Sequence, residues 1–319
     1  MTLAVLWHGL LWPLARLLLF VSLGMMVGNF IEALNWTQRV AKIAAPLTRL
    51  GRLSPVTGAS FSMAFFSGVA ANTMLAEAYD QKELPKLELV LANLFNSLPR
   101  FFLHLPTVFF LTAPLIKGAA VIYVGLTLAA AVLQTSLVVV AGRLLLPGPA
   151  AEQVAGTTTG GKVALSWREA LKKSWLRFRK RFKKIIRFTV PVYILFFLLN
   201  HYGVFGHVQQ LLADHAPLLA WLHPQSLGIV ALHVTAEFAA GLAAAGALLD
   251  AASIGYRDVV LALLVGNVLA SPVRAMRHQF PYYAGIFSPR LAVELILYSQ
   301  TFRVVSIVLV GTGYYYLSN

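Results

Sequence analysis

Four polar residues recur at helical spacing within an otherwise apolar segment of the sequence. Asn93, Ser97, Arg100 and His104 occupy positions i, i+4, i+7 and i+11. At about 100° per residue, this spacing places the four side chains on one narrow face of a helix. Arginine stays protonated, and its planar fork of donors fits carboxylate and phosphate groups. The stripe therefore predicts contact with an anionic ligand, or with an anionic part of one.

A second polar stripe repeats the first. When the sequence is shifted by 174 residues, Asn93 falls on Asn267 and Arg100 falls on Arg274. The full second stripe comprises Asn267, Ser271, Arg274 and His278, with Arg277 added. Residues of these types are rare inside apolar segments, so four matches at one shift indicate an internal duplication of the chain.

Small residues dominate a segment that precedes each stripe, at 55–80 and at 226–249. The first segment contains Asn72, and the second contains His233 and Glu237. A carboxylate among alanines can bind a cation, relay a proton or pair with an arginine. We therefore add these three residues to the two stripes as the predicted substrate-binding set.

A structural role for the arginines is the alternative to ligand binding. Burying an unpaired charge is costly, so Arg100 and Arg274 would then pair with buried acids. The candidate acids are Glu77, Glu88, Glu237 and Glu294. The sequence leaves both interpretations open.

Other kinds of chemistry have little support in the sequence. His207, His215 and His223 recur every eight residues, which does not place them on one helix face. The absence of cysteine excludes disulfides and thiolate metal sites. The chain also lacks a phosphate-binding glycine loop and a catalytic triad arrangement. We expect no enzyme activity, no resident cofactor and no metal site.

The composition identifies the class of protein in which these residues must work. Hydrophobic residues make up 58% of the 319 residues. Charged residues make up only 12%, where a soluble domain carries about 25%. A polytopic membrane protein is therefore predicted. We attribute the net charge of +14 to basic cytoplasmic loops that face anionic lipid, and not to a nucleic-acid partner.

The distribution of Lys and Arg favours one topology. If the two small-residue segments are re-entrant hairpins, each half crosses the membrane three times and the two halves are inverted. The basic stretches 39–52, 82–86 and 162–187 then all face the cytoplasm, and 206–225, which lacks Lys and Arg, lies outside. If every apolar segment crosses instead, the halves are parallel and the basic stretches fall on opposite sides. The first arrangement obeys the positive-inside rule, so we expect it, with both termini outside.

The predicted fold is therefore an all-α polytopic membrane protein built from an inverted repeat. Each half has three transmembrane helices and a re-entrant helical hairpin, with interfacial amphipathic helices added. The halves comprise residues 1–146 and 188–319. The connecting segment 147–187 is a cytoplasmic linker whose end, 166–187, is rich in Lys and Arg and has one apolar stripe. This end predicts an amphipathic helix that lies on anionic membrane lipids.

Several segments resemble nucleoside-recognition, or gate, domain membrane proteins. The first half has SFSMAFFSGVAANTMLAEAYD followed by LELVLANLFNSLPRFFLHLP. The second half has HVTAEFAAGLAAAGALLDAA followed by DVVLALLVGNVLASPVRAMRHQFP. Similar gates form the cores of concentrative nucleoside transporters, bacterial ferrous-iron transporters and spore maturation proteins. The resemblance implies a multi-pass protein of the prokaryotic plasma (inner) membrane.

The function expected from these features is secondary transport of a small anionic or polar solute. Pro99 and Pro106 are expected to break the helix of the first stripe, and Pro272 and Pro281 that of the second. The solute would bind between these two broken helices at the bilayer midplane. Two alternatives remain open at this stage: a flippase for a lipid phosphate, and a membrane scaffold or assembly factor without transport activity. The sequence also permits a homo-oligomer.

Overall fold

The computed structural model of the chain is helical throughout its described part. It describes residues 3–12, 14–16, 18–19, 22, 44–147, 167–169, 171–172, 175–176, 178–179, 186, 190, 194, 198, 202, 219, 221–236, 238–275, 279–280, 283 and 286–318. These residues form helices and short connections and contain no strand, which confirms the predicted all-α class. Three stretches are long and apolar enough to cross a membrane, namely Lys86–Ile116, Gly118–Leu145 and Pro289–Leu317. The predicted spans near 10–33 and 185–205 lie largely outside the described residues.

The first half contains a helical hairpin, a broken helix and a long helix in that order. A short helix α1 (Leu3–Leu6), a π-helical turn (Trp7–Leu11) and α4 (Ala44–Leu50) precede them. The hairpin comprises α5 (Pro55–Ala64) and α6 (Gly68–Asp80). The broken helix comprises α7 (Lys86–Phe95) and α8 (Ser97–Ile116), and the long helix is α9 (Gly118–Leu145).

The second half repeats this order. Its hairpin comprises α12 (Ser226–Ala236) and α13 (Phe238–Asp250). Its broken helix begins with α14 (Tyr256–Leu269) and α15 (Ser271–Arg274), and its long helix is α17 (Pro289–Leu317). Both small-residue segments thus form pairs of short helices, as the sequence predicts, and the element order agrees with the duplication.

Local interactions fix where the first hairpin begins. Ser54 precedes α5 in an extended conformation, and its hydroxyl accepts a hydrogen bond from the Thr57 amide at 3.4 Å. The Glu88 carboxylate of α7 accepts from the Ser54 amide at 2.7 Å and from the Thr57 hydroxyl at 2.9 Å. A capping residue that satisfies the first amides of a helix stabilises it by about 1 kcal/mol. Glu88 therefore ties the start of the hairpin to the broken helix beside it.

The breaks fall immediately before the stripe serines. α7 ends at Phe95 with Asn96 as its C-cap, and α8 begins with Ser97. α14 ends at Leu269 with Ala270 as its C-cap, and α15 begins with Ser271. Pro99 and Pro272 follow within the first turns, where their missing N–H groups prevent the ladder from continuing across the break. Pro106 was also expected to break the first helix, but it lies inside α8.

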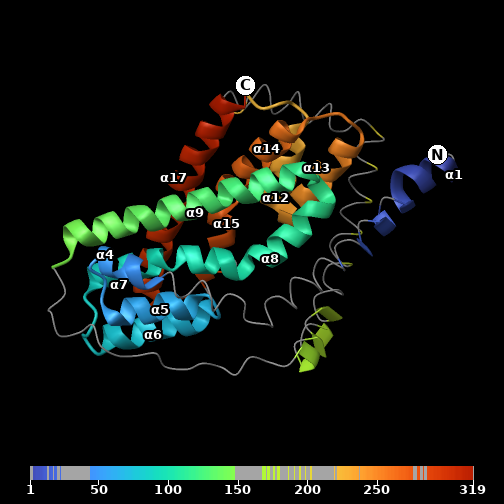
Figure 1. Ribbon diagram of the computed structural model, residues 1–319. Helices are drawn as coiled ribbons and strands as arrows, with labels where there is room; N and C mark the ends of the chain where they lie inside the picture. Colours follow the sequence, from blue (N-terminus) through green and yellow to red (C-terminus); the bar gives the residue numbers. More distant parts are fainter. Residues whose placement is uncertain are drawn as a thin grey trace.

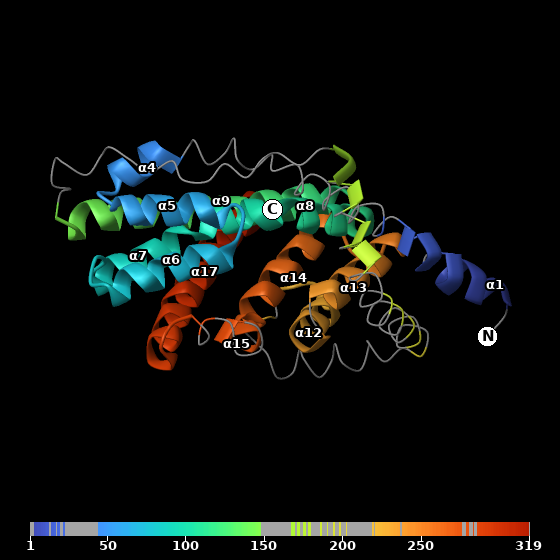
Figure 2. The ribbon, with the colours of Figure 1, turned by 90° about the horizontal axis from the view of Figure 1, so that it is seen from below.

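The long helices join the two halves, because each packs against both. The first part of α9 shares a buried cluster with α13 and α14, and its last part packs on α5 and α7. In α17 the pattern is reversed. Its first part shares a buried cluster with α6 and α7, and its last part contacts the cluster formed by α13, α14 and the first part of α9. The two long helices cross in contact with each other, with the hairpins at opposite ends of α9 (Figures 1 and 2).

The described residues of the predicted basic helix are helical, at 167–169, 171–172, 175–176 and 178–179. Trp167, Leu171 and Trp175 are exposed, whereas Phe178 is buried and its ring contacts the ring of Trp175. Apolar side chains are thus exposed on a helix that also carries Arg168, which is consistent with a helix that lies on a membrane surface.

Candidate functional site

Asn93, the last buried polar residue of α7, is the centre of the first-half cluster. Its side-chain amide donates to the Asn72 carbonyl oxygen of α6 at 3.2 Å and to the Tyr283 hydroxyl at 3.1 Å. Arg100 donates from Nη1 to the same Tyr283 hydroxyl at 3.1 Å and from Nη2 to the Asn93 main-chain carbonyl at 2.7 Å. Three of the predicted residues, from the hairpin and both parts of the broken helix, therefore meet.

Asn267 occupies the matching place in the second half. Its side-chain amide donates to the Tyr123 hydroxyl of α9 at 3.2 Å. The Nη2 atom of Arg274 donates to the Asn267 main-chain carbonyl at 3.0 Å and to its side-chain oxygen at 2.9 Å. The Ser271 hydroxyl donates to the same main-chain carbonyl at 2.9 Å. Asn267, Ser271 and Arg274 of the second stripe thus also form one cluster.

Both arginines act as caps on a helix C-terminus. Arg100 binds the main-chain carbonyls of Asn93, seven residues earlier, and of Asn96, four residues earlier. Arg274 binds the main-chain carbonyl of Asn267, also seven residues earlier. These carbonyls lie in the last turn before each break, where the partial negative charge of the helix dipole is concentrated. A cation there is favourable. The structure therefore provides a structural role for the stripe arginines that does not require an acid.

Each cluster is connected to the opposite half of the chain by one tyrosine. Tyr283, which precedes α17, binds Asn93 and Arg100 of the first half. Tyr123, which belongs to α9 of the first half, binds Asn267 of the second half. Both rings are buried, and Tyr123 stacks on Phe238 at a centroid distance of 5.8 Å. The sequence analysis did not identify these residues, because they are not equivalent under the 174-residue shift. Their hydroxyls inside apolar segments were the only available signal.

Arg303 was also missed, and it adds a second cation to the Asn267 cluster. It lies on α17 and donates from Nη2 to the Asn267 side-chain oxygen at 3.1 Å. The Arg274 Nη2 atom lies 2.9 Å from the same oxygen, so two guanidinium groups share one neutral acceptor. Under the 174-residue shift, position 303 corresponds to Ala129, so the first half has no counterpart.

Two of the acids proposed as partners of the arginines, Glu88 and Glu294, have other partners. Glu88 caps α5, as described above, and Glu294 forms a salt bridge of 2.6 Å with Lys86. Within the described part of the chain, Arg100, Arg274 and Arg303 form no salt bridge. Structural pairing with Glu88 or Glu294 is therefore wrong. Glu237 lies outside the described residues.

The remaining predicted site residues are placed differently. His233 is buried, with its ring 5.3 Å from that of Phe238 and with no hydrogen-bond partner for its Nδ1 atom. The Ser97 hydroxyl is buried without a hydrogen-bond partner. His104 is exposed. Arg277 and His278 lie outside the described residues.

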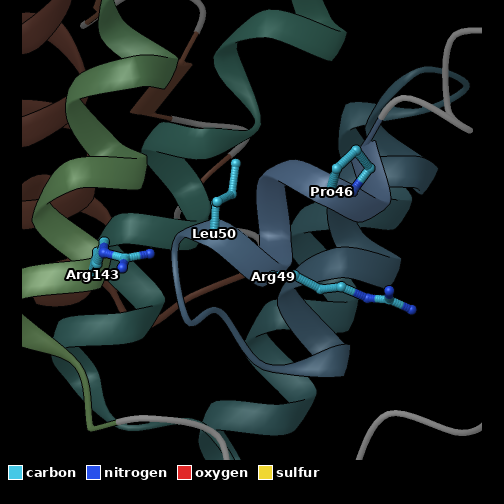
Figure 3. A pocket seen from close by; sticks show the side chains of 4 residues that line it. All are labelled: Pro46, Arg49, Leu50 and Arg143. Carbon is cyan, nitrogen blue, oxygen red and sulfur yellow. The ribbon is translucent and has the colours of Figure 1, made fainter.

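A surface hollow of about 490 Å³ lies at a distance from these clusters along α9. It is lined by Pro46, Arg49 and Leu50 of α4 and by Arg143 near the end of α9. Figure 3 shows that the Arg49 side chain extends away from Arg143. The hollow is open and its two arginines do not converge, so it does not have the arrangement of a small-solute site.

Comparison with known proteins gives relatives without an assigned role. Three proteins of Methanocaldococcus jannaschii, each described only as uncharacterized, are similar to this chain. They are 25%, 23% and 21% identical to it over 88%, 90% and 91% of its length, which is 87%, 91% and 94% of theirs. No family model and no solved structure match the chain. The chain is therefore similar to full-length archaeal proteins of comparable size, and the resemblance to gate-domain proteins stays a prediction.

Proposed function

We propose that this chain is a multi-pass membrane transport protein that carries a small anionic or polar solute between its two halves. The observation that carries the proposal is the meeting of polar side chains from both halves in the interior, where Asn93 binds Tyr283 and Asn267 binds Tyr123. Polar groups inside a membrane protein are costly, and they usually mark the pathway of a solute or ion.

The proposed topology follows the sorting of basic residues. Each of the two hairpins, α5–α6 and α12–α13, returns to the side of the bilayer from which it entered. The two halves are inverted relative to each other. The segment 147–187 faces the cytoplasm of a prokaryotic cell, and its amphipathic helix lies on anionic lipid. The breaks at Asn96 and Ala270 then belong near the middle of the bilayer, where the clusters of Asn93 and Asn267 would meet the solute.

The proposed mechanism is a rocking of one half against the other. Because each asparagine is bound to a tyrosine of the opposite half, any such movement must exchange these hydrogen bonds for others. A solute with hydrogen-bonding groups can supply the replacements, which couples its presence to the movement. The asymmetry between the clusters, with Arg303 on one side only, suits a solute whose two ends differ.

Uptake into proteoliposomes tests the proposal. The purified chain is reconstituted and assayed with labelled inorganic phosphate, C4 dicarboxylates, nucleosides and nucleoside monophosphates. We expect saturable uptake of at least one class. The replacements Arg100→Lys and Arg274→Lys should lower uptake, because lysine keeps the charge but loses the planar fork. The exposed Arg290 supplies the control variant Arg290→Lys, which should transport normally.

The opposite result is equally specific. If no class is taken up and the protein instead moves a labelled phospholipid between leaflets, the transport proposal is wrong and the flippase alternative replaces it. If neither activity is found and the arginine variants behave as the wild type, a scaffold function is favoured.

A further inference from the structure

We propose that Arg303 and Arg274 form an oxyanion site that takes a carboxylate or phosphate group. This inference rests on the proposed transport function and specifies the chemistry of the solute. It concerns one end of the polar interior, the Asn267 cluster, and it assigns the decisive role to a residue of α17 that lies outside both stripes.

Helix capping accounts for the stripe arginines but not for Arg303. Arg100 and Arg274 each bind main-chain carbonyls at the end of the preceding helix. Arg303 binds no main-chain carbonyl in the described residues, and its one hydrogen bond goes to a side-chain oxygen that Arg274 already occupies. A structural role that explains two of the three arginines therefore leaves the third unexplained.

The charges around Asn267 are not balanced within the described part of the chain. The Nη2 atoms of Arg274 and Arg303 both lie within 3.1 Å of one amide oxygen, and an amide carries no net charge. Neither arginine can lose its proton to relieve the repulsion. Two positive charges that contact the same oxygen atom repel each other strongly where water is scarce. An anion placed between the two guanidinium groups removes that cost.

Unused donors are available to bind such an anion. Arg303 has five N–H donors, and only its Nη2 atom has a hydrogen-bond partner in the described residues. The Nε atom of Arg274 is buried and has no hydrogen-bond partner. A buried donor left unpaired costs about 1–3 kcal/mol and often marks the place of a bound group. Two adjacent guanidinium groups with free donors match the oxygens of a carboxylate or a phosphate.

The site is restricted to the second half of the chain. The equivalent of Arg303 is Ala129, so the Asn93 cluster has one cation where the Asn267 cluster has two. In addition, the Arg100 fork binds the Tyr283 hydroxyl and two main-chain carbonyls through Nη1, Nη2 and Nε. We infer that the solute places its anionic end at Arg303 and a neutral polar end toward Asn93 and Tyr283.

The test measures anion binding by the whole purified protein. Thermal unfolding in detergent is followed with added sodium phosphate, sodium acetate or dioctanoyl phosphatidic acid, against sodium chloride at equal ionic strength. Phosphate or acetate should raise the melting temperature of the wild type. Arg303→Gln should bind the same anion about tenfold or more weakly, which corresponds to the loss of one charge-assisted contact. The control Arg290→Gln should bind normally.

A second variant keeps the test decisive if Arg303→Gln fails to fold. Asn267→Asp places a carboxylate between the two arginines without changing the size of the side chain. It should melt higher than the wild type in anion-free buffer, and phosphate should no longer raise its melting temperature. A lower melting temperature, together with an undiminished response to phosphate, would contradict the site.

The outcomes separate this inference from the transport proposal. If no anion stabilises the wild type, or if Arg303→Gln responds as Arg290→Gln does, the oxyanion site is wrong even where uptake persists. If phosphatidic acid alone stabilises the wild type and Arg303→Gln abolishes the effect, the site is correct but serves a lipid headgroup. In that case the proposal of a soluble solute is wrong.

Discussion

At the scale of single residues, the two asparagines organise the interior more than the arginines do. Asn93 and Asn267 use their side chains to reach the opposite half and their main-chain carbonyls to receive an arginine. An asparagine carries both donors and an acceptor, so it can join a hydroxyl and a guanidinium group at one point. Leucine at position 267 would leave the Tyr123 hydroxyl and the Arg303 guanidinium without the side-chain amide that they contact, whereas the main-chain carbonyl that receives Arg274 would remain.

The hydrogen bonds between the halves should contribute measurable stability. Tyr283→Phe removes the hydroxyl that serves both Asn93 and Arg100, and we expect it to lower the free energy of unfolding by about 1 kcal/mol, a typical value for a polar contact between membrane helices. Unfolding in sodium dodecyl sulfate measures the change. Tyr316→Phe is the matched control, since the Tyr316 ring is 71% exposed, and it should have no effect. Equal stability of the two variants would contradict the contact.

The limits of sequence reasoning are clearest at this scale. Pro99 correctly predicts a break in the helix of the first stripe, because the missing N–H group of a proline acts locally. Tyr283 and Arg303 reach the clusters from distant parts of the chain, and their positions depend on how α17 packs. No local pattern encodes that packing, so the third arginine was missed.

At the scale of elements, close approach of helices explains the small residues of the hairpins. A Cβ atom on Gly246 of α13 would lie 2.9 Å from the Leu115 carbonyl oxygen of α8, a contact with main chain that cannot rotate away. The sequence predicts such close packing from composition, since glycine and alanine let backbones approach. It does not indicate that the partner of the second hairpin is a helix of the first half.

A pair of glycine substitutions tests this packing. Gly246→Ala should destabilise the protein by about 1–3 kcal/mol, because α13 and α8 must separate to admit the methyl group. Gly125→Ala in α9 is the matched control, since nothing lies within 4 Å of its Cβ position. That change should be neutral or should stabilise the helix by about 0.5–1 kcal/mol. Melting temperatures of the two variants decide the matter, and a normal value for Gly246→Ala would show that the helices pack less closely than described.

At the scale of the whole molecule, the absence of cysteine makes the proposed topology directly testable. Ser318→Cys should react with an impermeant thiol reagent in intact cells, because both termini are proposed to face outward. Thr158→Cys should react only after the membrane is opened, because the 147–187 linker is proposed to face the cytoplasm. The reverse labelling would overturn the inverted arrangement.

The basic helix should help to fix that orientation. Neutralising Lys172, Lys173, Arg179, Lys180, Lys183 and Lys184 in the full chain removes six positive charges from the proposed cytoplasmic side. Each contributes about 1 kcal/mol of attraction to an anionic surface. We therefore expect a mixed population in which Ser318→Cys is labelled only in part. Uniform labelling would show that other segments set the orientation. Replacing the five lysines among them with arginine keeps the charge and should preserve uniform labelling.

The crossing of α9 and α17 has a consequence for how the chain is made. The first part of α9 packs against α13 and α14, which are synthesised about a hundred residues later. Until they emerge from the ribosome, one flank of α9 has only lipid or a chaperone to cover it.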